Sequence, residues 1–415
     1  MDLNEVIYLI EIDSKWIEDQ LRILKNFTDE GPGITRITYT KPWLKAHEYI
    51  KKLMIEEELE VKVDGVGNII GSFKPKGKLS KRVSTGSHID SVRNGGNYDG
   101  IVGVLSAIEI IRVIKRLKIE IDKQIDVIVF AAEEGERFNI GCLGSKAITG
   151  KLTEEQLNSI RDREGKTLLQ AIQECGFSGK IDECRIAKGY YNNFIELHIE
   201  QGPILESKGK DIGVVTGISA PSRIKVTFKG MAGHSGTVPM DHRRDALIPL
   251  AETILEVRRI IEPVKDLAVG TVGFIQVKPN VATIIPEEAT AIIEFRSLNK
   301  EVKDQLIETI LTRIGEISTK NKVDYDAKVI VDEKPVYIPT YIIELIEKVA
   351  NNLGYKTLRI PSGASHDAAH MMEICDVGMI FIPCKGGYSH MPKEETSIEN
   401  IVKGVKTLVH TILSI

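Results

Sequence analysis

The chain has 415 residues, enough for two or three domains at roughly 150 residues per domain. Hydrophobic residues make up 42% and charged residues 27%, which is close to the globular average and excludes a disordered or fibrous protein. The formal net charge is −4, and the sequence has neither a block of like charge nor an apolar run near the ~18 residues of a membrane span. We therefore expect neither nucleic acid nor membrane as a partner.

The five cysteines are odd in number and form no C-x-x-C pair. This usage is typical of reduced thiols rather than of a disulfide framework. The first residues have acids among the apolar positions, unlike a signal or transit peptide. These features predict a cytoplasmic location.

In the first half of the chain, helical spacing alternates with strand-like runs. Helices are expected at 4–27, 42–57, 100–118 and 166–174, and strands at 60–73, 83–87, 125–132 and 193–199. The segment from Val127 to Ala132 is apolar on both faces, as a central strand covered by helices would be. This alternation predicts an α/β domain with a mostly parallel sheet covered by helices.

The pattern changes near residue 218. Period-2 alternation at 223–229 and 269–277 predicts strands with one solvated face, and a helix is expected between them at 243–262. A strand at 289–297 and a helix at 300–319 complete a β-α-β-β-α order, which predicts a smaller inserted α+β domain at 218–330. The α/β pattern resumes with a helix at 341–353, a strand at 378–383 and a helix at 397–413. Residues 1–217 and 331–415 are thus predicted to form one discontinuous domain.

Five of the nine histidines share a placement that suggests chemistry. Each follows a predicted strand or lies in a glycine-rich turn: His88, His198, His234, His366 and His390. A single histidine of this kind is most simply a hydrogen-bonded one, but ligands of open α/β sheets bind at the carboxyl ends of the strands. We therefore expect several of these imidazoles to converge there.

Carboxylates accompany these histidines. Asp90, two residues after His88, is placed to hold that imidazole in one tautomer. Asp99 lies in a glycine-flanked turn that opens a helix, where it is either an N-cap or a carboxylate shared by two ions. Glu133 and Glu134 end an apolar strand, where a cation bound by one would relieve their repulsion and leave the other as a proton carrier.

Counting these donors gives three imidazoles and two carboxylates: His88, His198, His390, Asp99 and Glu134. Nitrogen and oxygen ligands without thiolate suit zinc first, with manganese, cobalt or nickel as alternatives. If Asp99 is shared, the five residues supply three ligands to each of two ions. Cys142, near the two glutamates, could be a thiol nucleophile, but a small buried hydrophobe is the simpler interpretation.

The segments that carry these residues resemble the dinuclear-metal aminoacylase and carboxypeptidase clan. Within it the chain is most similar to the amidase/hydantoinase/carbamoylase branch, which contains N-carbamoyl-L-amino-acid hydrolases, allantoate amidohydrolases and ureidoglycolate hydrolases. The stretches that carry the resemblance are GSHIDS, AAEEGERF, ELHIEQGPILE, AGHSGTVPMDHRRDAL, PSGASHDA and YSHMPKEE. The chain departs from the usual pattern at Thr283, Glu294 and Ser365, none of which is a predicted ligand.

The resemblance implies roles for individual residues. One ion would be held by His88, Asp99 and His198, and the other by Asp99, Glu134 and His390. Glu133 matches the general base, and His234 matches a histidine that enters the partner subunit's site and stabilises the oxyanion. The positions that match substrate-binding residues are Gln201, Asn280 and Arg296, the last binding the substrate carboxylate. Residues 218–330 match a lid and dimerisation domain, which predicts a homodimer formed through that domain.

The function this implies is hydrolysis of the carbamoyl C–N bond of N-carbamoyl-L-amino acids, a class of small ureido carboxylates. Allantoate and ureidoglycolate are the alternative substrates, because each also carries a carboxylate and a ureido carbon. A dipeptidase or aminoacylase is disfavoured by the HIEQGP stretch. A non-catalytic binding protein is disfavoured because all five ligands and Glu133 are present.

Overall fold

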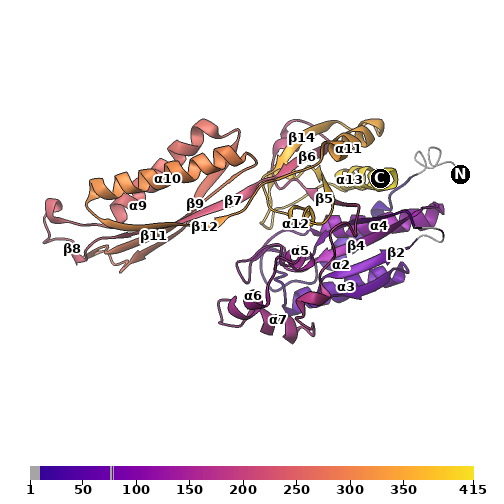
Figure 1. Ribbon diagram of the computed structural model, residues 1–415, viewed down its shortest axis with the longest axis horizontal. Helices are drawn as coiled ribbons and strands as arrows, with labels where there is room; N and C mark the ends of the chain where they lie inside the picture. The colour runs from indigo at the N-terminus through magenta and orange to yellow at the C-terminus, as the bar shows by residue number, and fades with distance from the viewer. Residues whose placement is uncertain (1–9, 75–76, 78) are drawn as a thin grey trace. The chain divides into compact units, whose positions relative to one another are not determined.

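The computed structural model describes residues 10–74, 77 and 79–415, and its chain divides into two compact units. The first unit comprises Met1–Thr216, Ile338–Ile360 and His366–Ile415, and the second comprises Gly217–Tyr337 and Pro361–Ser365. Figure 1 traces the elements along the chain. Each unit has a sheet and helices of its own, so each is described by itself.

The largest sheet has nine strands, in the order β1-β2-β4-β3-β5-β15-β6-β13, with β14 also pairing with β6. Its strands are β1 (Glu60–Val63), β2 (Ile69–Phe73), β3 (Lys81–His88), β4 (Lys123–Phe130), β5 (Asn193–Ile199), β6 (Ile212–Ile218), β13 (Val336–Tyr337), β14 (Thr357–Ser362) and β15 (Asp376–Ile382). The helices of the first unit are α2 (Ser14–Leu24), α3 (Lys41–Glu56), α4 (Ile101–Leu117), α5 (Leu143–Ile148), α6 (Glu154–Ser159), α7 (Leu168–Glu174), α8 (Ile204–Ser207), α11 (Thr340–Asn352), α12 (Asp367–Met371) and α13 (Ile398–Ser414). Short 3₁₀ turns lie at η1 (Ile181–Glu183) and η4 (Lys385–Gly387).

The middle of this sheet is parallel. β4, β3, β5 and β15 are neighbours and pair in parallel, whereas β2 on β4 and β6 on β15 pair antiparallel. Every residue of β4 is buried, as the two-sided apolar run at its centre predicts. Helices α4 and α13 contact each other and the central strands, and α5 and α12 form another such pair. The predicted α/β class is confirmed, and parallel pairing joins the four central strands.

The second unit is a four-stranded antiparallel sheet with two long helices on one face. The sheet order is β12-β7-β11-β9. Its elements are β7 (Ala220–Lys229), β8 (Gly233–His234), η2 (Met240–His242), α9 (Leu247–Ile261), η3 (Glu262–Val264), β9 (Ala268–Lys278), β10 (Ile284–Ile285), β11 (Glu288–Ser297), α10 (Lys300–Asn321) and β12 (Asp324–Asp332). Alternate residues of β7 and β11, among them Phe228 and Phe295, form a core with α9 and α10. The period-2 pattern arises because only this face of the sheet is covered.

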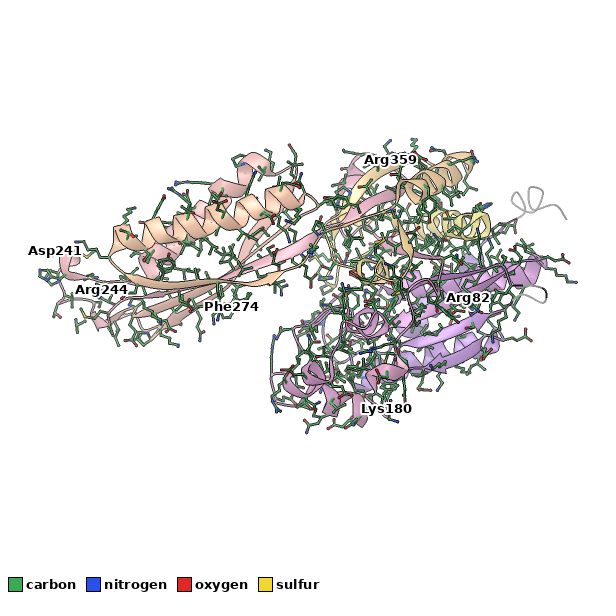
Figure 2. All side chains as sticks on the ribbon, in the orientation of Figure 1. Arg82, Lys180, Asp241, Arg244, Phe274 and Arg359 are labelled. Atoms are coloured by element: carbon green, nitrogen blue, oxygen red, sulfur yellow. The ribbon has the colours of Figure 1, made fainter. Side chains whose placement is uncertain are left out.

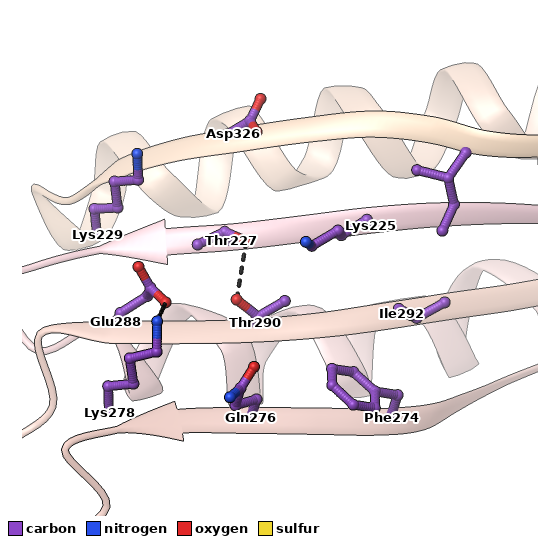
Figure 3. A pocket seen from close by; sticks show the side chains of 11 residues that line it. Lys225, Thr227, Lys229, Phe274, Gln276, Lys278, Glu288, Thr290, Ile292 and Asp326 are labelled. Carbon is purple, nitrogen blue, oxygen red and sulfur yellow. Dashed lines mark hydrogen bonds and ion pairs between the residues drawn. The ribbon is translucent and has the colours of Figure 1, made fainter. Parts of the chain in front are cut away.

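The opposite face of this sheet contains a hollow of about 570 Å³ (Figure 3). Thr227 and Thr290 lie across it with their hydroxyl oxygens 2.9 Å apart, and Lys278 pairs with Glu288 at 2.6 Å. Phe274, labelled in Figure 2, lines it and is 44% exposed. Of the described residues, those that line this hollow include none of the predicted site residues.

Three local expectations differ from the structure. The first helix of the described residues begins at Ser14, where the Asp13 carboxylate accepts from the Trp16 N–H, and residues 4–9 of the predicted span lie outside the described residues. The strand expected at 60–73 is a hairpin, because Asp64 accepts from the backbone N–H groups of Val66 and Asn68 and closes a turn. Strand β12 was missed, because its alternating charges are typical of an exposed edge strand.

A membrane span would need a long apolar helix. Within residues 10–74, 77 and 79–415, no helix has the length and hydropathy to cross a bilayer.

Candidate metal centre and active site

Each of the four central parallel strands delivers one candidate side chain to the same end of the sheet. His88 is the last residue of β3, and His198 is the penultimate residue of β5. Glu134 follows β4, and His390 follows β15 in the loop before α13. These strands are neighbours in parallel register, so their carboxyl ends meet at one edge. This topology explains why residues up to 302 positions apart come together.

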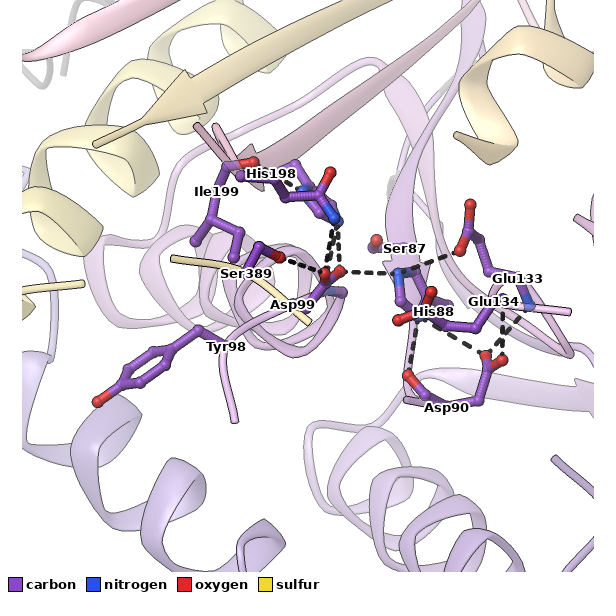
Figure 4. A network of polar contacts seen from close by, with 12 residues as sticks. Ser87, His88, Asp90, Tyr98, Asp99, Glu133, Glu134, His198, Ile199 and Ser389 are labelled. Atoms are coloured by element: carbon purple, nitrogen blue, oxygen red, sulfur yellow. Dashed lines mark hydrogen bonds and ion pairs between the residues drawn. The ribbon is translucent and has the colours of Figure 1, made fainter. Parts of the chain in front are cut away.

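Asp99 has contacts with three of these four residues, and Figure 4 shows it between His198 and His88. One carboxylate oxygen, Oδ1, is 3.3 Å from His88 Nε2 and 3.1 Å from His198 Nε2. The other, Oδ2, is 3.3 Å from His390 Nε2, and that nitrogen is 3.3 Å from Glu134 Oε2. The two oxygens of Asp99 therefore face two different groups of potential ligands.

These contacts define two triads of metal-ligand type. The first triad is His88, Asp99 and His198, and the second is Asp99, Glu134 and His390. Within each triad the candidate ligand atoms lie within 4.8 Å of one another. The first triad is fully buried, whereas the His390 side chain is 47% exposed. Five nitrogen and oxygen donors with no thiolate suit zinc or another divalent transition ion.

The electrostatics of the cluster favour a cation. Burial raises the pKa of Glu133, and burial together with the charges of Asp99 and Glu133 raises the pKa of Glu134 well above its usual value. Burial also opposes the charged form of Asp99, but the His198 imidazole and hydrogen bonds from the histidines hold the pKa of Asp99 well below its usual range. Burial lowers the pKa of His88, but the Glu133 charge and other nearby carboxylates outweigh it and raise that pKa well above normal. Such crowded buried carboxylates need positive charge between them.

The ring orientations of the two buried histidines are fixed by backbone carbonyls. His88 Nδ1 is 3.1 Å from the carbonyl oxygen of Asp90, and His198 Nδ1 is 2.8 Å from that of Ile199. If each Nδ1 carries the proton, Nε2 has its lone pair directed at Asp99, as a ligating histidine requires. The Asp90 carboxylate is 3.6 Å from His88 and instead accepts from the backbone N–H groups of Glu133 and Glu134. Asp90 thus contacts His88 more closely through its main chain than through its side chain.

Glu133 is close to the triads without belonging to either. Its carboxylate Oε2 lies 3.8 Å from His88 Nε2, and the residue is 9% exposed. The Cys142 thiol donates to Glu133 Oε1 at 3.4 Å. Burial raises the pKa of this thiol well above normal, which opposes a nucleophilic thiolate and agrees with Cys142 as a small buried residue.

The predicted substrate-binding residues and the predicted catalytic residue His234 are divided between the units. Gln201 lies in the first unit, where its amide nitrogen donates to Asp99 Oδ2 at 2.7 Å. His234, Asn280 and Arg296 lie in the second unit, on or beside strands β8, β9 and β11. Arg296 donates to Glu294 Oε1 at 3.0 and 2.9 Å and to the Gly363 carbonyl at 3.1 Å.

Two glutamates at the site were not singled out from the sequence. Glu196 forms a further triad with His198 and His366, and it accepts from the Ser87 hydroxyl at 2.7 Å. Glu394 is buried, and its carboxylate accepts from the backbone N–H groups of Asp99 and His390. Strand alternation could have identified Glu196, which points to the same side as His198. Glu394 is preceded and followed by charged residues, and no periodicity distinguishes it.

Comparison with known proteins identifies the family. Residues 85–414 match the model of Peptidase family M20/M25/M40. The chain is 37% identical to a ureidoglycolate hydrolase of Arabidopsis thaliana, over 97% of this chain and 87% of that protein. It is 36% identical to an N-carbamoyl-L-amino-acid amidohydrolase of Paenarthrobacter aurescens, over 95% of this chain and 96% of that protein. A crystal structure of a hydantoinase/carbamoylase family amidase from Burkholderia multivorans superimposes with a TM-score of 0.88 at 32% identity, covering 98% of each chain.

The chain therefore belongs to Peptidase family M20/M25/M40, and it is a hydrolytic enzyme. The predicted resemblance to the hydantoinase/carbamoylase amidases is confirmed. Enzymes of this family use a dinuclear metal site, and the two triads that share Asp99 are a donor set of that kind.

Proposed function

We propose that this enzyme hydrolyses the carbamoyl C–N bond of N-carbamoyl-L-amino acids at two divalent ions bound by the two triads. The observation that carries the proposal is the placement of Asp99, whose two oxygens face separate sets of ligands. Asp99 would therefore be a ligand shared by both ions, as in dinuclear metal hydrolases. The full-length similarity to an N-carbamoyl-L-amino-acid amidohydrolase supports the choice of substrate.

The residues around the triads then have distinct tasks. When bound, the ions supply Lewis acidity and make water a competent nucleophile near neutral pH. Glu133 accepts a proton from the attacking water and returns it to the nitrogen that leaves. His234 hydrogen-bonds the oxygen that becomes negative as the carbonyl carbon turns tetrahedral. Cleavage of the C–N bond releases ammonia, and the carbamate that remains gives carbon dioxide and the free amino acid.

Arg296 is proposed to select substrates with a carboxylate, because guanidinium binds that group in a bidentate manner. Its Nε and Nη2 atoms already donate to Glu294, and Nη1 donates to the Gly363 carbonyl. A substrate carboxylate would therefore approach the edge formed by Nη1 and Nη2. Gln201 and Asn280 are proposed to bind the polar groups near the scissile bond.

A substrate panel with defined metal loading tests this function. The enzyme is dialysed against a chelator, and ammonia release is measured with N-carbamoyl-L-amino acids, ureidoglycolate and allantoate after adding zinc, manganese, cobalt or nickel. We expect no activity without metal and the highest kcat/KM with an N-carbamoyl-L-amino acid. Failure of every divalent ion to restore any activity would refute the metal-dependent mechanism.

Ureidoglycolate is the second candidate substrate, because the chain is equally similar to a ureidoglycolate hydrolase over nearly its whole length. Both compounds present a ureido carbon and a carboxylate, so the same triads and Arg296 would serve. A kcat/KM for ureidoglycolate at least tenfold above that of every carbamoyl amino acid would assign that substrate instead.

We further propose that the enzyme is a homodimer formed through the second unit, with His234 acting in the partner's site. Co-expression of His234→Ala and Glu133→Gln chains tests this. In a mixed dimer, one site combines an intact Glu133 with an intact His234 from the other chain. Random pairing makes half of the dimers mixed, so we expect about a quarter of the wild-type activity, whereas each variant alone is nearly inactive. No recovery in purified mixed dimers would place His234 in its own chain's site.

A further inference from the structure

Two candidate ligands, Asp99 and His390, are held by one buried carboxylate that is not itself a predicted ligand. Glu394 is 5% exposed. Its Oε1 accepts from the backbone N–H groups of Tyr98 and Asp99, each at 3.0 Å. Its Oε2 lies 3.2 Å from the Ser389 hydroxyl and 3.4 Å from the backbone N–H of His390. Glu394 thus connects two loops that are about 290 residues apart in the sequence.

Glu394 belongs to neither triad, and its carboxylate oxygens face donors of the protein. Three backbone N–H groups donate to this carboxylate, and the Ser389 hydroxyl, whose single proton is shared between Glu394 Oε2 and Asp99 Oδ2, lies 3.2 Å from each. The carboxylate is also packed directly on Gly96, where an added Cβ would lie 2.1 Å from Oε1 and 2.3 Å from the Glu394 Cβ. A glycine there lets the side chain approach the turn that carries Asp99. Glu394 is therefore positioned to hold the two loops together.

The second triad depends on this connection more than the first. His88 and His198 lie on central strands, and backbone carbonyls orient their rings. His390 instead lies in a loop, has a positive φ of 58°, and is 47% exposed. The backbone N–H of His390 donates to the Glu394 carboxylate. Loss of that carboxylate would therefore displace His390 while the first two histidines stay in place.

We propose that Glu394 is a positioning residue that sets the affinity of the second triad, Asp99, Glu134 and His390, for its metal ion. This inference rests on the proposed metal centre. Residues that orient metal ligands from behind typically contribute 10–100-fold to metal affinity. We expect a loss of that size for the second ion, and a smaller effect on the ion at His88 and His198, where only the main chain of Asp99 loses a contact.

Glu394→Gln tests the proposal because the amide keeps the shape of the side chain. The NH₂ group of the glutamine is a donor and cannot accept from a backbone N–H. Either the loop of Tyr98 and Asp99 or the loop of His390 therefore loses its acceptor. Glu395→Gln is the matched control, because Glu395 is the next residue, its side chain is 52% exposed, and it pairs with Lys385 at 2.9 Å. The full-length, metal-free proteins are titrated with Mn²⁺ and with Zn²⁺, and stoichiometry and both dissociation constants are measured by calorimetry. The melting temperature of each metal-free protein is recorded in parallel.

We expect wild type and Glu395→Gln to bind two ions per chain with the same affinities. Glu394→Gln should bind one ion within about threefold of the wild-type affinity and the other 10–100-fold less tightly, with little change in the metal-free melting temperature. Excess metal should restore kcat of this variant, with KM for substrate unchanged. The inference is refuted if the variant binds both ions like wild type, or if both weaken equally. A wild-type protein that binds fewer than two ions would overturn the proposed function as well.

Discussion

Replacing Glu133 with glutamine should remove most of the activity while leaving the metal content unchanged. Glu133 belongs to neither triad, and its Oε2 lies 3.8 Å from His88 Nε2. Glutamine has the same shape, and its carbonyl oxygen can still accept from the Cys142 thiol, which is 3.4 Å from Oε1 in the structure. The substitution therefore removes the proton acceptor and little else.

The expected loss follows from that single role. General base catalysis contributes about 10²–10⁴-fold, which corresponds to roughly 3–6 kcal/mol at about 1.4 kcal/mol per decade. We expect kcat to fall by this factor and KM to change by less than about threefold. The measurement is steady-state ammonia release with the best substrate of the panel, accompanied by metal analysis of the same sample.

Glu134→Gln is the informative contrast, because the neighbouring carboxylate faces His390 in the second triad. That variant should lose one ion per chain, and added metal should restore part of its activity. For Glu133→Gln, added metal should have no effect. A Glu133→Gln enzyme that retains both ions and full kcat would show that another group takes the proton. One that loses an ion would show that Glu133 is a ligand.

Two further predictions concern substrate selection and pH dependence. Arg296→Lys should raise KM about 10–100-fold with kcat nearly unchanged, because lysine cannot bind a carboxylate in a bidentate manner. The control is Arg223→Lys, because Arg223 is the other arginine that donates to Glu294. Equal changes of KM in both variants would contradict the assignment of Arg296. Burial, then the charge of Lys406, lowers the pKa of His410 to about 4, and this side chain is buried in α13. In the unfolded chain the pKa of His410 has its ordinary value near 6.5. Between about pH 6.5 and 4 the unfolded chain therefore binds more protons than the folded one, and the free energy of unfolding falls as the pH falls. His410→Leu should recover about 1–2 kcal/mol of the loss between pH 7 and 5 in urea unfolding of the metal-free enzyme, and an unchanged pH dependence would refute this.

The sequence was sufficient to predict that the candidate ligands converge, because the parallel pairing of the central strands brings their carboxyl ends together. Once His88, Glu134 and His198 are placed after buried strands, parallel pairing brings their carboxyl ends to one edge. Asp99 was ambiguous between a helix N-cap and a shared carboxylate. In the structure Gly100 occupies the N-cap position of α4, and the Asp99 side chain faces the histidines instead.

What the sequence could not reveal are contacts made by loops. Glu394 and Glu395 are adjacent and chemically identical, yet one is buried against Gly96 and the other is exposed. Only the folded loops distinguish them. The same holds for Gln201, whose predicted contact is with substrate but whose amide donates to Asp99 in the structure. The edge strand β12 was not predicted for a related reason. Most of its residues are exposed, so its sequence carries no pattern of buried apolar positions.

Anomalous scattering from crystals of the metal-loaded enzyme tests the central claim most directly. The account predicts two ions per chain, about 3.5–4 Å apart, one contacting Asp99 Oδ1 together with His88 and His198, and the other contacting Oδ2 together with Glu134 and His390. A single ion at full metal loading, or two ions that do not share Asp99, would contradict it.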